Sequence, residues 1–212
     1  MAKGNVEARR TPRGPKRRDM ILAEAAKLFR ERGFHGVGID DIGAAAGISG
    51  PGVYRHFRSK EAVLSALIEL AHTRLIDGAE RIVEQGLPPR VTLEQLIRSH
   101  VQAVLDDPNV IAVYFLESRH LSPEARLHRR RRERMYVEHW AATMADLRDD
   151  LTEGYVQMAV QSVLWLIKSY SFRRDGLDPH KVEELMTAMA LAALTVPVPG
   201  FGLRSQVPSE SL

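Results

Sequence analysis

The sequence contains no cysteine among its 212 residues. Disulfide scaffolds, thiol nucleophiles and cysteine-ligated metal sites are therefore excluded, and a chain of this kind suits the reducing cytoplasm. No apolar stretch precedes the first predicted helix, which argues against a secretory signal. No apolar run reaches the ~18–20 residues of a membrane span, because Gln157, Gln161 and Ser162 interrupt the most apolar segment. We expect a cytoplasmic protein that does not enter a membrane.

Catalytic signatures are also missing. The chain has no G-x-S-x-G turn, no Walker loop, no dinucleotide fingerprint and no H-E-x-x-H motif. Glu117 and His120 are the nearest approach to a metal-binding pair on a helix, but a di-metal bundle needs several such pairs. One pair at this spacing is far more often a surface ion pair. The sequence therefore predicts neither an enzyme nor a bound metal ion or cofactor.

Charge is ordinary in amount but uneven in distribution. Lys and Arg number 30 against 27 for Asp and Glu, a net charge of +3 that is too small to indicate a nucleic-acid partner. Seven of the first 18 residues are Lys or Arg. We expect residues 1–15 to be a disordered basic arm, either a solvated tail or an arm that lies along DNA; the adjacent motif favours DNA.

A second basic cluster lies between His128 and Arg134. Its arginines at 129–132 either form a solvated helical face that pairs with nearby acids or line a cationic opening for an anionic effector. A second DNA-binding site is the weakest of the three interpretations. The choice between the first two stays open at the level of sequence.

Apolar periodicity is helical throughout and alternates like a strand nowhere. We expect an all-α fold of nine helices. Their approximate limits are 16–32, 39–46, 50–58, 59–85, 92–106, 108–117, 122–149, 152–173 and 178–195.

The stretch from Gly33 to Glu61 organises the rest of the chain. Ile39, Ile42 and Ala46 form one apolar stripe of a short helix, and Gly47 follows where a helix end tolerates a positive φ. Ser49 is placed to cap the next helix, with Pro51 in its first turn. A helix, a glycine turn and a cationic second helix are typical of a helix-turn-helix.

These residues resemble the DNA-binding domain of TetR-family transcriptional regulators. The resemblance rests on Ile39-Asp40-Asp41-Ile42-Gly43, on Ala46-Gly47-Ile48-Ser49 and on Tyr54-Arg55-His56-Phe57-Arg58-Ser59-Lys60-Glu61, and it covers about residues 16 to 64. Three features depart from the family pattern: Gly38 replaces the usual hydroxyl cap, Gly43 replaces the usual alanine, and no small hydroxyl lies near Gly52.

The resemblance implies a domain order and a set of DNA contacts. We expect a basic arm at 1–15, a DNA-binding domain at 16–60, a ligand-binding and dimerisation domain at 61–196 and a disordered tail at 197–212. Arg55 is the best candidate for a base edge, whereas Tyr54, His56 and Lys60 should hold phosphates. The full set of predicted DNA contacts is Arg17, Arg18, Ser49, Gly50, Pro51, Gly52, Tyr54, Arg55, His56 and Lys60.

The C-terminal helices are predicted to bind a small molecule and a second copy of the chain. Apolar and aromatic residues at helical spacing indicate either ordinary core or a ligand cavity, and the resemblance favours the cavity. The candidate lining is Tyr114, Phe115, Arg134, Trp140, Met144 and Trp165. The last two helices carry enough apolar surface for a four-helix dimer interface. Its candidate residues are Val160, Leu164, Ile167, Leu185 and Met189.

We therefore expect a homodimeric regulator that binds a palindromic double-stranded DNA operator and is released by a small-molecule effector, such as a lipid or acyl-CoA. Activation rather than repression is an alternative with the same fold. The rival class is a helical ligand-binding or scaffold protein that does not bind an operator.

Overall fold

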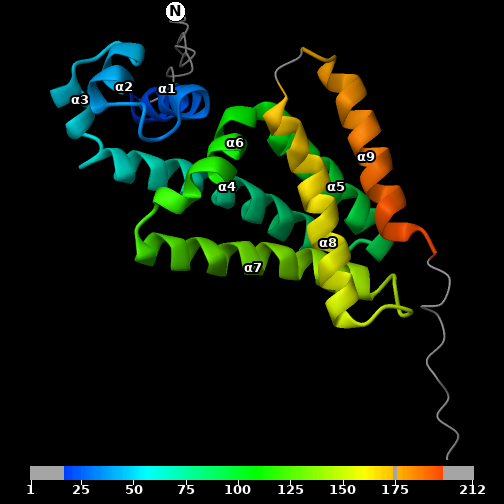
Figure 1. Cartoon of the computed structure of the whole chain (residues 1–212). Helices are drawn as coiled ribbons and strands as arrows, with labels where there is room; N and C mark the ends of the chain where they lie inside the picture. Colours follow the sequence, from blue (N-terminus) through cyan, green and yellow to red (C-terminus); the bar gives the residue numbers. More distant parts are fainter. Residues whose placement is uncertain (1–16, 174–175, 198–212) are drawn as a thin grey trace, which may run out of the picture.

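A computed structural model describes residues 17–173 and 176–197. Within these residues the chain forms nine α-helices, two short 3-10 helices and no strand, which confirms the all-α prediction (Figure 1). The predicted arm at 1–15 and all but Pro197 of the predicted tail lie outside the described residues. The elements are α1 (Arg17–Arg32), α2 (Ile39–Ala45), α3 (Gly50–Tyr54), α4 (Lys60–Val83), α5 (Pro89–Asp106), α6 (Pro108–Glu117), η1 (Ser118–His120), α7 (Pro123–Ala145), α8 (Glu153–Lys168), η2 (Ser169–Phe172) and α9 (Pro179–Thr195).

Side-chain caps define where several helices begin. The hydroxyls of Ser49, Ser59 and Ser122 each accept a hydrogen bond from a backbone N–H three residues later, at 3.2–3.3 Å. These bonds satisfy amide groups that have no partner inside the helix. A proline in the first turn of α3 and α7 fits because its missing N–H would have been unpaired there.

Three helices end four or five residues before their predicted limits. α3 stops at Tyr54, because the amides of His56 and Phe57 both turn back to the carbonyl of Val53 before α4 begins. α7 ends at Ala145 rather than near Asp149. Beyond this end, the side chain of Arg148 donates to Asp150 and to the carbonyls of Leu194 and Val196, which holds the loop after α7 against the end of α9. α8 ends at Lys168, and the rest of its predicted length is the 3-10 turn η2.

The long helix α4 connects two packed units. We call α1–α3 the N-terminal unit and α5–α9 the C-terminal unit. In Figure 1 the N-terminal unit lies at one end of α4, α7 runs alongside α4, and α8 and α9 lie together at the far side. α4 packs against α1, α5, α6 and α7, so it contacts both units.

Direct contacts also join the two units beside α4. The ring of Phe34, in the α1–α2 loop, stacks on His120 of η1, with centroids 5.1 Å apart and planes at 15°. His35 meets the same imidazole edge-on at 4.4 Å. On α1, the Arg30 guanidinium donates to Asn109 Oδ1 at 2.8 Å and to the Arg173 carbonyl at 2.7 Å. A shift of η1 or α6 would therefore change contacts that the N-terminal unit makes directly.

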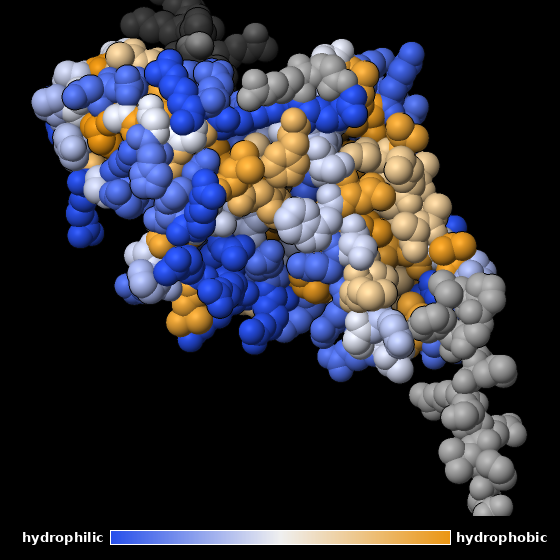
Figure 2. All heavy atoms as spheres, viewed as in Figure 1, coloured by the Kyte–Doolittle hydropathy of each residue, from blue (hydrophilic) through white to orange (hydrophobic). Residues whose placement is uncertain are grey.

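The surface divides by polarity. Figure 2 shows hydrophobic colour gathered over α8 and α9, and mostly hydrophilic colour over the N-terminal unit and α7. The exposed apolar side chains on α8, η2 and α9 are Tyr155, Met158, Trp165, Phe172, Leu185 and Met189. Among the described helices, none is both long enough and apolar enough to cross a membrane.

Candidate nucleic-acid interface and ligand region

The helix-turn-helix is held together by a small apolar core. Ile42 of α2, Ala46 just after α2, Val53 of α3 and Phe57 between α3 and α4 are all buried, at 0–5% exposure. Gly47 adopts φ +66°, a left-handed conformation that glycine tolerates and that turns the chain from α2 toward α3. The predicted inward stripe and glycine turn therefore position α3 against α2.

Gly43 allows the turn before α3 to approach α2 very closely. A Cβ at this position would lie 2.9 Å from the carbonyl oxygen of Ile48 and 3.1 Å from the amide nitrogen of Gly50. Both are backbone atoms, so a side chain here would push the Ile48–Gly50 turn away from α2. The departure from the usual alanine at this position thus has a structural role: it sets how tightly the recognition segment packs.

The recognition segment presents polar side chains to solvent. Tyr54, Arg55 and His56 are all exposed, and Tyr54 is 55% exposed although it is aromatic. Ser49 and Pro51 are also accessible at the start of α3, whereas Gly50 is buried against Asp40. Exposed donors on a segment this rigidly packed suit contacts with phosphates and base edges.

Two arginines of α1 join this surface. The guanidinium of Arg17 reaches the carbonyl of Ala46 at 3.5 Å, and that of Arg18 lies 4.9 Å from the centre of the Phe57 ring. A shallow depression of about 320 Å³ lies between Arg17 and the recognition segment; it is lined by Arg17, Ile48, Ser49, Gly52, Arg55 and His56. The side chains of Arg17, Arg55 and His56 therefore border one hollow, where they could contact a DNA phosphate.

Lys60 does not share this arrangement. Its ammonium donates to the carbonyl oxygens of Phe34 at 2.8 Å and Val37 at 2.7 Å, and it lies 4.5 Å from the centre of the Phe34 ring. In this conformation the predicted phosphate-binding lysine faces the α1–α2 loop instead. It ties the start of α4 to that loop.

The residues predicted to bind a ligand fall into separate clusters. Trp140 and Met144 are fully buried on α7, where Trp140 packs against His100 and Tyr136. Trp165 on α8 is 51% exposed and contacts Phe115, with ring centroids 4.7 Å apart. Tyr114 is buried next to Phe115 on α6, and Arg134 lies on α7 and is not buried. Ring contacts thus place the two tryptophans in different environments.

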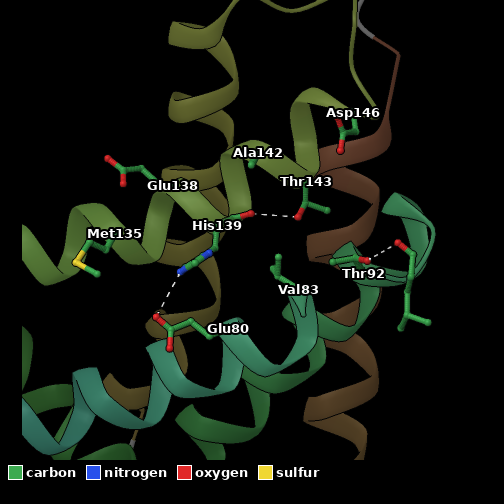
Figure 3. A pocket seen from close by; sticks show the side chains of 10 residues that line it. Glu80, Val83, Thr92, Met135, Glu138, His139, Ala142, Thr143 and Asp146 are labelled. Carbon is green, nitrogen blue, oxygen red and sulfur yellow. Dashed lines mark hydrogen bonds and ion pairs between the residues drawn. The ribbon is translucent and has the colours of Figure 1, made fainter. Parts of the chain in front are cut away.

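One cavity of about 430 Å³ lies between the end of α4, the start of α5 and α7 (Figure 3). Figure 3 shows Glu80 and His139 reaching toward each other across it, with Oε1 and Nε2 3.9 Å apart. Its threonine hydroxyls are already engaged, since Thr92 donates to the Leu87 carbonyl and Thr143 to the His139 carbonyl. Glu80, Glu138 and Asp146 line it without a Lys or Arg, so this cavity does not suit an anion.

The arginine run on α7 is divided between two faces. Arg129 donates to Tyr114 Oη at 3.0 Å and to Glu133 at 2.9 Å, and Arg132 donates to Thr73 at 3.1 Å. Arg130 and Arg131 are exposed. Helical spacing of three residues therefore turns two arginines toward α4 and α6, and the run is neither wholly a solvated face nor wholly a binding site.

Sequence reasoning missed two buried titratable residues close to this run. His72 of α4 and Lys168 of α8 are only 4% and 5% exposed. A lysine at the end of the apolar helix α8 could have indicated a buried charge. The sequence does not show whether it is buried, because its burial depends on how the helices pack.

The five residues predicted for the dimer interface divide into a buried set and an exposed set. Val160, Leu164 and Ile167 are 0–1% exposed and belong to the protomer's own core, where they face the neighbouring helices. Leu185 and Met189 on α9 are 60% and 44% exposed. Only the α9 pair is therefore accessible to another molecule.

Comparison with known protein families gives two matches that together cover most of the chain. Residues 21–67 match the family model of bacterial regulatory proteins of the tetR family, and residues 86–194 match that of the tetracyclin repressor-like C-terminal domain. The second match alone spans more than half of the chain.

Individual relatives agree. The chain is 36% identical over 105 residues to the transcriptional repressor KstR2 of Rhodococcus jostii, a match that covers 50% of this chain and 52% of the relative. It is 27% identical to the transcriptional activator FasR of Mycolicibacterium smegmatis, over 99% of this chain and 82% of the relative.

Solved structures show the same fold. PfmR, a TetR-family regulator from Thermus thermophilus, superposes with a TM-score of 0.72 at 27% identity, over 82% of this chain and 96% of that one. AibR, solved in complex with isovaleryl coenzyme A and operator DNA, superposes with a TM-score of 0.67 at 22% identity, over 82% and 97%.

Proposed function

The chain belongs to the TetR family of bacterial regulatory proteins, and on that premise we propose that it binds a palindromic DNA operator as a homodimer and is released by a small-molecule effector. Its membership makes it a helix-turn-helix transcriptional regulator and not an enzyme. The DNA-binding part corresponds to residues 16–60 and the regulatory part to residues 61–196. The observation that carries operator binding is the exposure of Arg17, Tyr54, Arg55 and His56, three of which (Arg17, Arg55 and His56) border one hollow.

Dimerisation is supported by the exposed apolar surface on α8 and α9. Side chains of this size rarely gather on the surface of a monomer, and such patches mark interaction sites. We assign the interface to Met158 and Trp165 of α8 with Leu185 and Met189 of α9, because the other α8 residues predicted for it are buried in the protomer. Pairing these faces across a two-fold axis gives a four-helix interface.

Effector control is supported by the way α4 contacts both units. A ligand bound beside α4 or α6 would alter the contacts of Phe34 with His120 and so the setting of the two recognition segments. A dimer must hold those segments about one DNA turn, ~34–36 Å, apart. A coupling free energy of only ~1–3 kcal/mol would change operator affinity roughly 5–150-fold.

The effector class is inferred from relatives. AibR is solved with isovaleryl coenzyme A, and on that basis we propose an apolar acid or its coenzyme A thioester. Activation is the alternative outcome of the same DNA contacts, favoured by the similarity to FasR over nearly the whole chain. In either case the protein would act in the cytoplasm, on the chromosome.

Electrophoretic mobility shift against the DNA upstream of its own gene tests operator binding. We expect a specific complex, and we expect Arg55→Ala to weaken it and to relax preference at one base position. Arg98→Ala, at an exposed position on α5, is the control and should bind as the wild type does. A protein that binds random and upstream duplexes equally would favour the rival class of helical ligand-binding protein.

A further inference from the structure

A second cavity lies between α4 and the first half of α7. It measures about 360 Å³, within the size range of small-molecule sites. Ala66, Ile68, Leu121 and Ala125 provide apolar walls, and His72 with Arg129 forms the polar part. Ser65, Glu69 and His128 complete the lining.

His72 is an unusual residue in this position. Neither ring nitrogen has a hydrogen-bond partner within the described residues, although the side chain is only 4% exposed. Burial first, and then the positive charges of Arg132, Arg129 and Lys168 together with His128, lower the pKa of His72 to about 3. The positive charges of four basic side chains from α7 and α8 thus act on an imidazole at the cavity wall.

Lys168 adds a buried charge that forms no ion pair within the described residues. Among the residues that the structure describes, its ammonium has no hydrogen bond and no ion pair, and it lies 4.8 Å and 5.9 Å from the ring centres of Phe115 and Tyr114. Burial lowers the pKa of Lys168 to about 8, Glu133 opposes that shift and Arg129 adds to it. An uncompensated buried cation costs stability unless something pairs with it.

The surrounding carboxylates do not balance the cations. Glu133 pairs with Arg129 at 2.9 Å, and Glu69 pairs with Arg132 at 3.5 Å and with His128 at 3.3 Å. Arg129, Arg132 and Lys168 therefore face two carboxylates, which leaves one positive charge. Arg129 also has spare donors, because its Nε has no partner in the described part of the chain.

We propose that this cavity, which we call the α4–α7 pocket, binds an apolar carboxylic acid whose single negative charge is met by Arg129, while the buried charge of Lys168 acts from outside the lining and the apolar body of the ligand lies against Ile68 and Leu121. The proposal rests on the proposed function, since it names the effector chemistry of the regulatory part. Arginine matches a carboxylate through two parallel hydrogen bonds. One carboxylate would balance the one uncompensated charge, whereas a coenzyme A thioester has no carboxylate at that position.

The position of the pocket also suits control of the DNA-binding part. Leu121, which lines it, directly follows His120, and His120 stacks on Phe34 of the N-terminal unit. A ligand that displaces Leu121 would therefore act on the contact between the two units.

Matched pairs of acids and amides test the charge requirement. We would measure binding of octanoate against octanamide, and of naphthoate against naphthamide, by isothermal titration calorimetry with the full chain, and include octanoyl-CoA. At least one acid should bind, with its amide roughly tenfold or more weaker, because the amide lacks the charge. Arg129→Gln should reduce acid affinity about tenfold and abolish the difference between acid and amide. Lys168→Met should also reduce acid affinity, but less than Arg129→Gln does, because Lys168 does not line the pocket. Arg130→Gln, on the exposed side of α7, should have no effect.

Thermal stability provides a second readout. Lys168→Met should raise the melting temperature of the unliganded protein, since it removes an unpaired buried charge. Equal binding of acid and amide, binding of octanoyl-CoA alone, no binding of either acid, or a destabilised Lys168→Met protein would each overturn the proposal. None of these outcomes affects operator binding, which the mobility shift tests separately.

Discussion

The ammonium group of Lys60 donates a hydrogen bond to the carbonyl oxygen of Val37 over 2.7 Å. A second bond, to the Phe34 carbonyl, makes Lys60 a clamp between the start of α4 and the loop that precedes α2. The sequence predicts that Lys60 binds a DNA phosphate, but in the free protein its side chain stabilises the fold.

Replacing this clamp should affect stability more than electrostatics. We expect Lys60→Met to lower the free energy of unfolding by about 1.5–3 kcal/mol, as for hydrogen bonds to a charged group, and to leave the salt dependence of DNA binding unchanged. Urea unfolding and mobility shifts over a range of salt concentrations measure the two effects. Lys27→Met, at an exposed position on α1, is the control. A smaller salt slope with unchanged stability would instead mean that Lys60 leaves the carbonyls to hold a phosphate.

Gly43 should be intolerant of even one methyl group. Gly43→Ala would place a Cβ 2.9 Å from the Ile48 carbonyl oxygen, so we expect the recognition segment to shift and operator affinity to fall roughly tenfold, the scale of a lost base contact. Circular dichroism should show nearly unchanged helix content. Gly154→Ala, where nothing lies within 4 Å of the added carbon, is the matched control and should be neutral or slightly stabilising. Full operator affinity in the Gly43→Ala protein would show that the turn adapts without moving α3.

The proposed dimer should depend on the exposed face of α9. Leu185→Glu puts a charge at a position that is 60% exposed in the protomer but buried in the proposed interface, so we expect sedimentation equilibrium to show monomers. Leu127→Glu changes a leucine that is 51% exposed on α7 and should leave the dimer intact. A wild-type protein that sediments as a monomer at micromolar concentration would refute the interface altogether.

Acid should destabilise the protein through His72. Its pKa is lowered from 6.5 to about 3, so the unfolded chain binds a proton that the native state does not. Stability is therefore present above the unfolded pKa and is lost as pH falls below about 6.5 toward 3. Between about pH 7.5 and 5.5 this residue alone should contribute a loss of about 1.4 kcal/mol.

Urea unfolding at fixed protein concentration across that pH range measures the effect. We expect His72→Phe to reduce the pH dependence of the free energy of unfolding by the part that His72 contributes. The remainder comes in part from His100, whose pKa is also lowered by burial. His180→Gln, at an exposed position on α9, is the control. An identical slope in the His72→Phe protein would mean that this imidazole gains a partner on protonation.

Interactions between residues close in sequence determine the helices and the helix-turn-helix, so both could be predicted without knowledge of the packing. Helical periodicity predicted nine helices, and Ser49, Ser59 and Ser122 predicted where three of them begin, because a cap involves only neighbouring residues. The helix-turn-helix was predictable for the same reason: its buried stripe and its glycine turn lie within one short stretch of chain.

Tertiary structure decided everything that depends on which helix lies beside which. α8 is apolar on nearly every side, so periodicity could not distinguish buried Leu164 from exposed Trp165. The partners of Lys60 lie 23 and 26 residues away in sequence, and the polar cluster of His72, Tyr114, Arg129 and Lys168 draws one residue from each of four helices. Long-range packing sets their burial, so that, within the described residues, an ordinary lysine becomes a charge without an ion pair and an ordinary histidine an imidazole without a hydrogen bond.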